Sequence, residues 1–262
     1  MKNIMKMTIY EFFKKSLSRT IYICAFVSLC LILLVNHYFE PDQTFLDILA
    51  GTDDGTFIVT SMIVSVAVMC VIVAQMCGSD FQDKTIHYDL MFGHSRKQVY
   101  FGRVFAGMLV GTIGTTVMIV VPFILACFLY KIDAGILWSG ILVRAILLMI
   151  IIIRMACELI LIIFLLKNVQ MAGIIYIGML GGISYMCNTI GDVNAYMFGI
   201  TNIEEVLTIV NWSTYTLHGK TVNVMQYMPA ADMIFHTLVV NIVLGGICIM
   251  LGYFVFCKDD LR

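Results

Sequence analysis

Charged side chains are scarce in this sequence. Asp, Glu, Lys and Arg make up 13% of its 262 residues, against about 25% in soluble domains. Only 3 prolines occur, while 61% of the residues are hydrophobic and the mean hydropathy is +0.96. A soluble domain of this length does not need so many apolar residues to form its core, so the composition excludes a soluble globular protein. The sequence predicts a polytopic membrane protein.

The motifs of several enzyme classes are also missing. No GxxxxGK[ST] occurs, so the chain does not bind ATP through a P-loop, and neither HExxH nor GxSxG is found. Its 9 cysteines form no CxxC pair, and none stands at metal-ligand spacing from a histidine. Buried structural thiols are therefore expected rather than disulfides or a zinc site. We expect no catalytic residue, no metal and no cofactor in this chain.

Six long apolar segments occupy most of the chain. Each has about the 20 residues that a helix needs to cross a bilayer, and together they predict an all-α fold with a single transmembrane domain. An even number of spans places both termini on one side of the membrane. The expected spans are residues 20–38, 56–78, 104–130, 141–166, 170–188 and 234–256.

Lys and Arg are concentrated on one side of these segments. They cluster before the first segment, between the second and third, and after the last, whereas the loops on the other side are rich in Asp and Glu. Cytoplasmic loops of membrane proteins carry an excess of Lys and Arg. We therefore expect both termini and the loop of residues 79–103 to be cytoplasmic.

The N-terminal residues 3–19 are amphipathic. Ile9, Tyr10 and Phe13 share one helical face, and Lys14 belongs to the other. This pattern is typical of a helix that lies in the headgroup plane. Basic residues before an apolar run also resemble a signal peptide, but no small-residue cleavage site follows, so we expect the segment to be retained.

The loop between the second and third apolar segments predicts a short surface helix. Ser79 and Gln82 have the spacing of a capping box at its start, and Gly93 suits the left-handed position that ends a helix. Ser95 and Gln98 form a second capping box, which opens the next helix. We expect this surface helix to be presented to a soluble partner.

Three charged residues lie inside the fourth apolar segment. Arg154 and Glu158 stand near its middle, one helical turn apart, and a lone Arg at a helix centre costs about 2.5–3.5 kcal/mol on insertion scales. Arg144 stands near the outer end, where its side chain can reach the headgroups. The three residues predict a polar lining for a translocation path or a subunit contact. Equally open is a neutralised pair that only fixes helix packing.

The outer loop of residues 189–233 is too apolar for a free tether. Asn202 with Glu205 resembles a capping box, and the apolar residues that follow recur at helical spacing. We expect a re-entrant helical hairpin in the outer leaflet before the last span; a soluble cap is the alternative. The residues of this expected outer helix are Ile203, Val206, Leu207, Val210 and Trp212.

This layout resembles the ABC-2 type permeases, the membrane subunits of ATP-binding-cassette exporters. In that family the loop before the third span has an acidic residue, a Thr, a Ser-Arg pair and a closing basic residue. Lys84 stands where the family has Gly, and His94 stands where it often has Pro. At the matching positions this chain has Asp80, Thr85, Ser95, Arg96 and Arg103.

The resemblance implies several partners. A separate ATPase subunit would bind ATP and Mg and grip a coupling helix at residues 80–92, and a second permease subunit, identical or different, would complete the path across the lipid bilayer. No nucleic acid is implied. The implied cargo is amphipathic or hydrophobic, such as an antimicrobial peptide, as in bacterial peptide-export and immunity permeases of the plasma membrane. The residues implied in ATPase coupling are Asp80, Phe81, Asp83, Lys84, Thr85, Tyr88, Ser95, Arg96 and Arg103.

Two other classes of function stay open from the sequence. A membrane sensor or scaffold would share the helical layout without transporting anything. An intramembrane hydrolase would draw on Glu204, Glu205 and His236, but no second histidine is spaced to complete a metal site with them.

Overall fold

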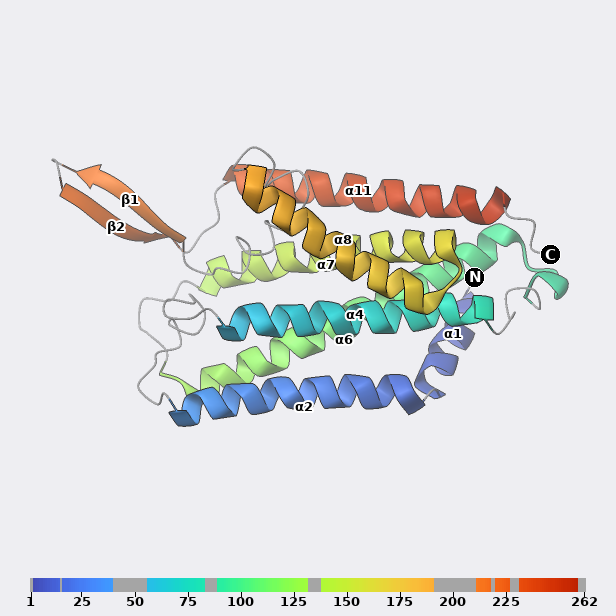
Figure 1. Ribbon diagram of the computed structural model, residues 1–262, viewed down its shortest axis with the longest axis horizontal. Coiled ribbons are helices and arrows are strands. Elements are labelled where there is room, and N and C mark those ends of the chain that lie inside the picture. The colour runs from blue at the N-terminus through green and yellow to red at the C-terminus, as the bar shows by residue number, and fades with distance from the viewer. Residues whose placement is uncertain are drawn as a thin grey trace.

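The computed structural model describes residues 2–14, 16–39, 56–82, 89–131, 138–190, 211–217, 220–226 and 231–258. Helices account for most of them, and one two-stranded antiparallel sheet precedes the last helix (Figure 1). The helices are α1 (Lys2–Lys14), α2 (Ser16–Phe39), α4 (Thr56–Gln82), α6 (Arg96–Leu129), α7 (Trp138–Leu166), α8 (Val169–Ile190) and α11 (Ala231–Lys258). The strands are β1 (Asn211–Leu217) and β2 (Lys220–Gln226).

Several of these helices are long and apolar enough to cross a bilayer, which confirms the prediction of a membrane protein. Within the described residues there are 4 of them, at Arg19–Phe39, Arg96–Leu129, Trp138–Leu166 and Ile234–Lys258. Shorter apolar stretches lie in α4 at Val64–Gly78 and in α8 at Val169–Leu180. The predicted helical segments thus agree with helices in the structure, and four of those helices meet the length for a span.

The long helices alternate in direction along one axis. Figure 1 shows that successive long helices run in opposite directions; these helices are α2, α4, α6, α7, α8 and α11. In consequence α1, the start of α6 and the end of α11 lie at one end of the molecule, which we call the α1 end. The strands lie at the opposite end, the hairpin end.

Helix α7 forms the centre of the bundle. Of its most apolar stretch 61% is buried, against 11% for α2 and 17% for α11. It packs on α4, α6, α8 and α11, and buried residues such as Ile151, Leu159 and Ile163 belong to the main hydrophobic core. A buried polar residue on α7, such as Arg154, is therefore surrounded by protein rather than by lipid.

Close packing joins α6 to its neighbours. A Cβ atom added at Gly107 or Gly111 would come within 2.7 Å of Cys77 or Val73 on α4. Tyr100 is fully buried and donates a hydrogen bond to the carbonyl oxygen of Ile249 on α11, at 2.8 Å. A Cβ at Gly252 would lie 2.5 Å from the Tyr100 hydroxyl. These small residues let the helices approach closely.

The N-terminal amphipathic helix is shorter than expected. α1 ends at Lys14 and α2 already begins at Ser16, so Arg19 belongs to the apolar helix. The side of α1 that packs on the protein includes Ile4 and Phe12, which are buried, while Tyr10 and Phe13 are exposed. The α1 residues that pack on the protein, spaced four apart, thus differ from the predicted apolar stripe, whose Tyr10 and Phe13 stay exposed; that this stripe meets the headgroup plane stays a prediction.

The expected start of the surface helix is also wrong. α4 continues through Gln82, so Ser79 lies inside that helix and does not cap a new one. Gly78 offers no stop, because it packs on Val169, where an added Cβ would come within 2.6 Å. Gly93 does have a left-handed backbone, with φ of 85°, and Ser95 with Gln98 forms the predicted capping box.

A β-hairpin stands where a helical hairpin was expected. Trp212 lies in β1 opposite Met225 of β2, and Tyr215 lies opposite Val222. Thr, Val, Trp and Tyr dominate these segments, and such residues favour extended strands over helices. The prediction of a helical hairpin is therefore wrong for residues 211–226. Four residues of the expected outer helix, namely Ile203, Val206, Leu207 and Val210, lie outside the described residues.

Candidate intramembrane polar site

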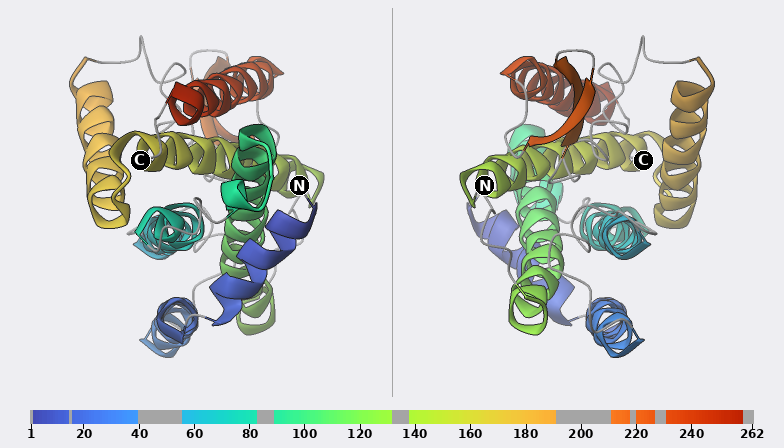
Figure 2. Two further views of the ribbon diagram at one scale, coloured as in Figure 1. Left: turned by 90° about the vertical axis from the view of Figure 1, so that its right-hand side faces the viewer. Right: turned by 90° about the vertical axis from the view of Figure 1, so that its left-hand side faces the viewer.

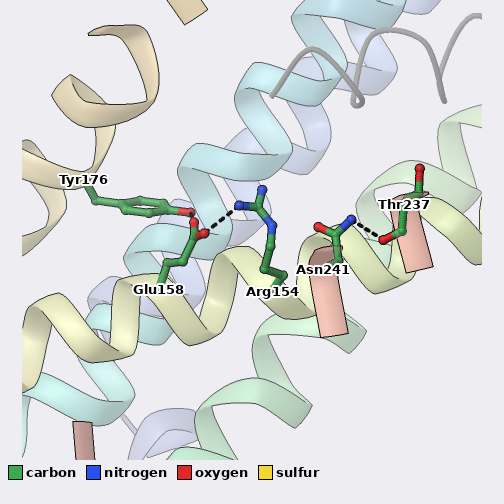
Figure 3. A network of polar contacts seen from close by, with 5 residues as sticks. All are labelled: Arg154, Glu158, Tyr176, Thr237 and Asn241. Atoms are coloured by element: carbon green, nitrogen blue, oxygen red, sulfur yellow. Dashed lines mark hydrogen bonds and ion pairs between the residues drawn. The ribbon is translucent and has the colours of Figure 1, made fainter. Parts of the chain in front are cut away.

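The charged pair on α7 lies deep in the bundle. Arg154 is 3% exposed, and its Nη1 atom lies 2.5 Å from Oε1 of Glu158, one turn along the helix. The second carboxylate oxygen of Glu158 accepts a hydrogen bond from the hydroxyl of Tyr176 on α8, at 3.2 Å. Figure 3 shows Tyr176 and Arg154 on opposite sides of this carboxylate. Both oxygens of this partly buried acid therefore accept a hydrogen bond.

The guanidinium of Arg154 has more N–H donors than it has hydrogen-bond partners among the described residues. Its Nε and Nη2 atoms are buried and have no hydrogen-bond partner among the described residues. Asn241 of α11 is buried nearby and donates from Nδ2 to the carbonyl oxygen of Thr237, at 2.6 Å, while its own Oδ1 has no partner in the described part of the chain. In Figure 3 Asn241 lies on the side of Arg154 away from Glu158. Donors and an acceptor thus occur together between α7 and α11.

Backbone packing brings the two helices together at this point. A Cβ at Gly245 of α11 would lie 3.8 Å from the Cα of Arg154. A buried ion pair is stable only when its remaining hydrogen-bonding groups are also satisfied. Two Arg154 nitrogens have no such partner among the described residues, so the site contains N–H donors that only an acceptor oxygen from elsewhere would satisfy.

Arg144 is buried but does not join the pair. Its exposed fraction is 2%, so the expectation that it extends to the headgroups is wrong. It precedes Arg154 by ten residues, a rise of about 15 Å along a helix. The structure therefore brings together Arg154 and Glu158 of the predicted site, and leaves Arg144 in a separate environment nearer the hairpin end.

At the α1 end, two arginines of the predicted coupling set hold helices together. Arg103 is buried and forms an ion pair with Asp89, with 2.6 Å between Nη2 and Oδ2. Arg96 donates from Nη1 to the carbonyl oxygen of Cys257, at 2.8 Å. Carbonyl groups in the last turn of a helix lack partners within it, so Arg96 caps α11. Arg103 thus connects the loop to α6, and Arg96 connects the start of α6 to α11.

The turn that follows Asp89 exposes two large apolar residues. Met91 and Phe92 are each 80% exposed, and the turn is closed by a hydrogen bond from Gly93 N to Leu90 O, at 3.1 Å. Ser95 caps α6 directly after it. We call residues 89–95 the α4–α6 turn.

Of the other predicted coupling residues before the α4–α6 turn, the structure describes only the helix that holds two of them. Asp80 and Phe81 belong to the last turn of α4. Asp83, Lys84, Thr85 and Tyr88 lie outside the described residues. The contact surface that the structure does describe in this region is Met91 and Phe92.

Three residues of these sites were missed in the sequence. Asp89 was overlooked because its partner Arg103 is 14 residues away. Tyr176 and Asn241 are single polar residues within apolar segments, and such residues commonly face protein rather than lipid. That signal was present for Asn241, but it does not specify which helix the residue contacts.

Comparison of the chain with protein-family models, with curated proteins and with solved structures finds no match. Within the described part of the chain, no group of three or more His, Cys, Asp or Glu residues could hold a metal ion.

Proposed function

We propose that this chain is the membrane permease subunit of an ATP-binding-cassette exporter, with six spans in a bacterial plasma membrane. A separate ATPase subunit would dock on the α4–α6 turn, and the cargo would be an amphipathic or hydrophobic molecule such as a membrane-active peptide. The observation that carries the proposal is the pair Met91 and Phe92. Two large apolar side chains, 80% exposed on a turn fixed at both ends, form an apolar contact surface for another protein.

The distribution of lysines supports a cytoplasmic position for this turn. Lys97 starts α6, Lys167 follows α7 and Lys258 ends α11, so these exposed lysines lie at the α1 end (Figure 1). Because Lys and Arg are enriched in cytoplasmic segments, the α1 end with both termini would face the cytoplasm. A cytoplasmic ATPase would then reach the turn.

The two arginines give the turn a mechanical connection to the spans. Arg103 ties Asp89 to α6, and Arg96 ties the start of α6 to the end of α11. Movement of the turn would therefore be transmitted to two long helices at once. Arg96 also moves with α11, which packs on α7 beside Arg154.

Within the bilayer, the Arg154 site would provide a polar contact on the path. Its spare donors suit the carbonyl or carboxylate oxygens of a peptide. A second permease subunit would supply the facing wall of the path.

The docking proposal is tested by co-purification with a candidate ATPase subunit. We expect Phe92→Glu to abolish co-purification, because a charge replaces the apolar contact. Phe128→Glu is the matched control: Phe128 is 84% exposed and lies on α6 near the hairpin end, away from the proposed contact. If both variants retain the ATPase, or if no ATPase binds the wild-type chain, the proposal fails.

A transport measurement separates an exporter from a sensor or scaffold. In inside-out vesicles that contain the complex, ATP should drive uptake of a fluorescent antimicrobial peptide, and Phe92→Glu should reduce uptake to background. A complex that binds ATPase but moves no peptide would contradict export of this cargo class.

A further inference from the structure

An apolar hollow lies where α1 meets the membrane helices. It has a volume of about 430 Å³ and is lined by residues of α1, α2, α4 and α6, a size within the range of ligand sites. Figure 2 shows α1 crossing α6 at this end of the bundle. The lining includes Ile9 and Phe12 from α1, Ile72 from α4, and Leu109 and Ile113 from α6.

One cation lines this otherwise apolar space. Arg19, at the start of the apolar stretch of α2, is exposed and forms no ion pair with a described acidic residue. Tyr22 also lines the hollow, but its hydroxyl already donates to the carbonyl oxygen of Gly114, at 3.1 Å. The hollow is therefore apolar inside, and the exposed cation Arg19 forms its basic rim.

A second, shallower hollow adjoins the first. Its volume is about 550 Å³, and it lies beside Met5 of α1 and Ile153 of α7. Leu109 and Ile113 line both hollows, so these two side chains form a ridge between them. Two neighbouring apolar hollows next to a basic rim match the shape of a lipid with two acyl chains and one anionic headgroup.

We propose that this region binds one anionic diacyl phospholipid, with its phosphate on Arg19 and its acyl chains along the two sides of the Leu109–Ile113 ridge. The apolar lining suits acyl chains, which have no hydrogen-bonding groups, whereas exposed peptide backbone would lose its hydrogen bonds there. A helix from a second copy fits poorly, because a cylinder about 10 Å across would fill roughly 430 Å³ within one turn. The basic rim selects an anionic headgroup, and anionic lipids are enriched in the cytoplasmic leaflet. The site does not depend on the proposed transport function.

Native mass spectrometry tests the lipid site directly. The purified chain is mixed with equal amounts of phosphatidylglycerol and phosphatidylcholine, and the lipid retained after detergent removal is counted. We expect the wild-type chain to retain one phosphatidylglycerol in preference to phosphatidylcholine. Arg19→Gln should lower that preference by about fivefold, the value of one basic side chain near an anionic surface. Lys97→Gln, an exposed cation on α6 outside the hollow, should leave it unchanged.

A second pair of variants tests the hollows without changing charge. Ile113→Trp should place a bulky ring on the ridge between the hollows and weaken retention of the lipid, whereas Ile124→Trp on the same helix should not. Ile113 and Ile124 are similarly exposed, at 55% and 47%, and circular dichroism checks that both variants fold. Equal retention by all variants, no preference for the anionic lipid, or a dimer peak in place of bound lipid would overturn the proposal.

Discussion

At the scale of single residues, the environment of Arg154 is the feature with the largest consequences. Its guanidinium has one nitrogen on Glu158 and two buried nitrogens without partners in the described part of the chain. Glu158 in turn depends on Arg154 and Tyr176 for the hydrogen bonds of its two oxygens. Removing one member of such a pair leaves an uncompensated charge, which costs more than removing both.

We therefore predict that Arg154→Leu lowers the free energy of unfolding by about 3–5 kcal/mol, because it leaves the partly buried Glu158 without its cation. The double variant Arg154→Leu with Glu158→Leu should recover most of this loss. Reversible denaturation in micelles measures both effects. A single variant as stable as the wild type would contradict the burial of the pair.

The same double variant decides between the two roles of the pair. If it folds but no longer moves peptide in the vesicle measurement, then Arg154 and Glu158 contribute to the path. Transport at the wild-type rate would mean that the pair only fixes the packing of α7 against its neighbours.

At the scale of elements, contacts near the α1 end connect α6 with α11. Tyr100 inserts against α11, where its ring packs on Phe256 with 5.7 Å between centroids and on Tyr253 with 5.5 Å. Its hydroxyl bonds to the α11 backbone. Gly252 makes this insertion possible, because any larger residue would occupy the space of the hydroxyl.

Gly252→Ala is accordingly expected to lower the free energy of unfolding by about 1–3 kcal/mol through overpacking. Gly246→Ala serves as the control, since no atom lies within 4 Å of a Cβ added there. Thermal unfolding of the two variants in one detergent gives the comparison. Equal stability would show that α6 and α11 pack less closely than described.

At the scale of the whole molecule, the alternating helices place the α1 end and the hairpin end at opposite ends of the bundle (Figure 1). The exposed lysines Lys97 near the start of α6, Lys167 after α7 and Lys258 at the end of α11 lie at the α1 end. The β-hairpin follows α8 and precedes α11, which runs back to the α1 end. The end of the bundle at which a given loop lies therefore depends on the number and direction of all the helices before it.

A pair of reporter fusions measures this topology. A fluorescent protein fused after Arg262 should fluoresce, because we expect the C-terminus to be cytoplasmic. Alkaline phosphatase inserted between His218 and Gly219 should be active, because we expect the hairpin to lie outside. Reporters that place both positions on the same side would contradict the alternating arrangement and the proposed six spans.

Some features of the fold depend only on nearby residues, and the sequence determined these. The apolar segments predicted the helices because hydrophobic length is a local property. Gly93 and the capping box of Ser95 with Gln98 were predicted correctly, because a left-handed turn and a helix cap involve only neighbouring backbone atoms. The pairing of Arg154 with Glu158 likewise followed from their one-turn spacing.

The tertiary structure alone decided the features that join distant parts of the chain. Ser79 and Gln82 had cap spacing, yet α4 continued past them, with Gly78 packed on α8. Arg96 bonds to the backbone of α11, and Glu158 accepts a hydrogen bond from Tyr176 of α8. The position of Trp212 follows from the pairing of β1 with β2. Local spacing does not encode which distant backbone or side chain will be adjacent, because that depends on how all the helices pack at once.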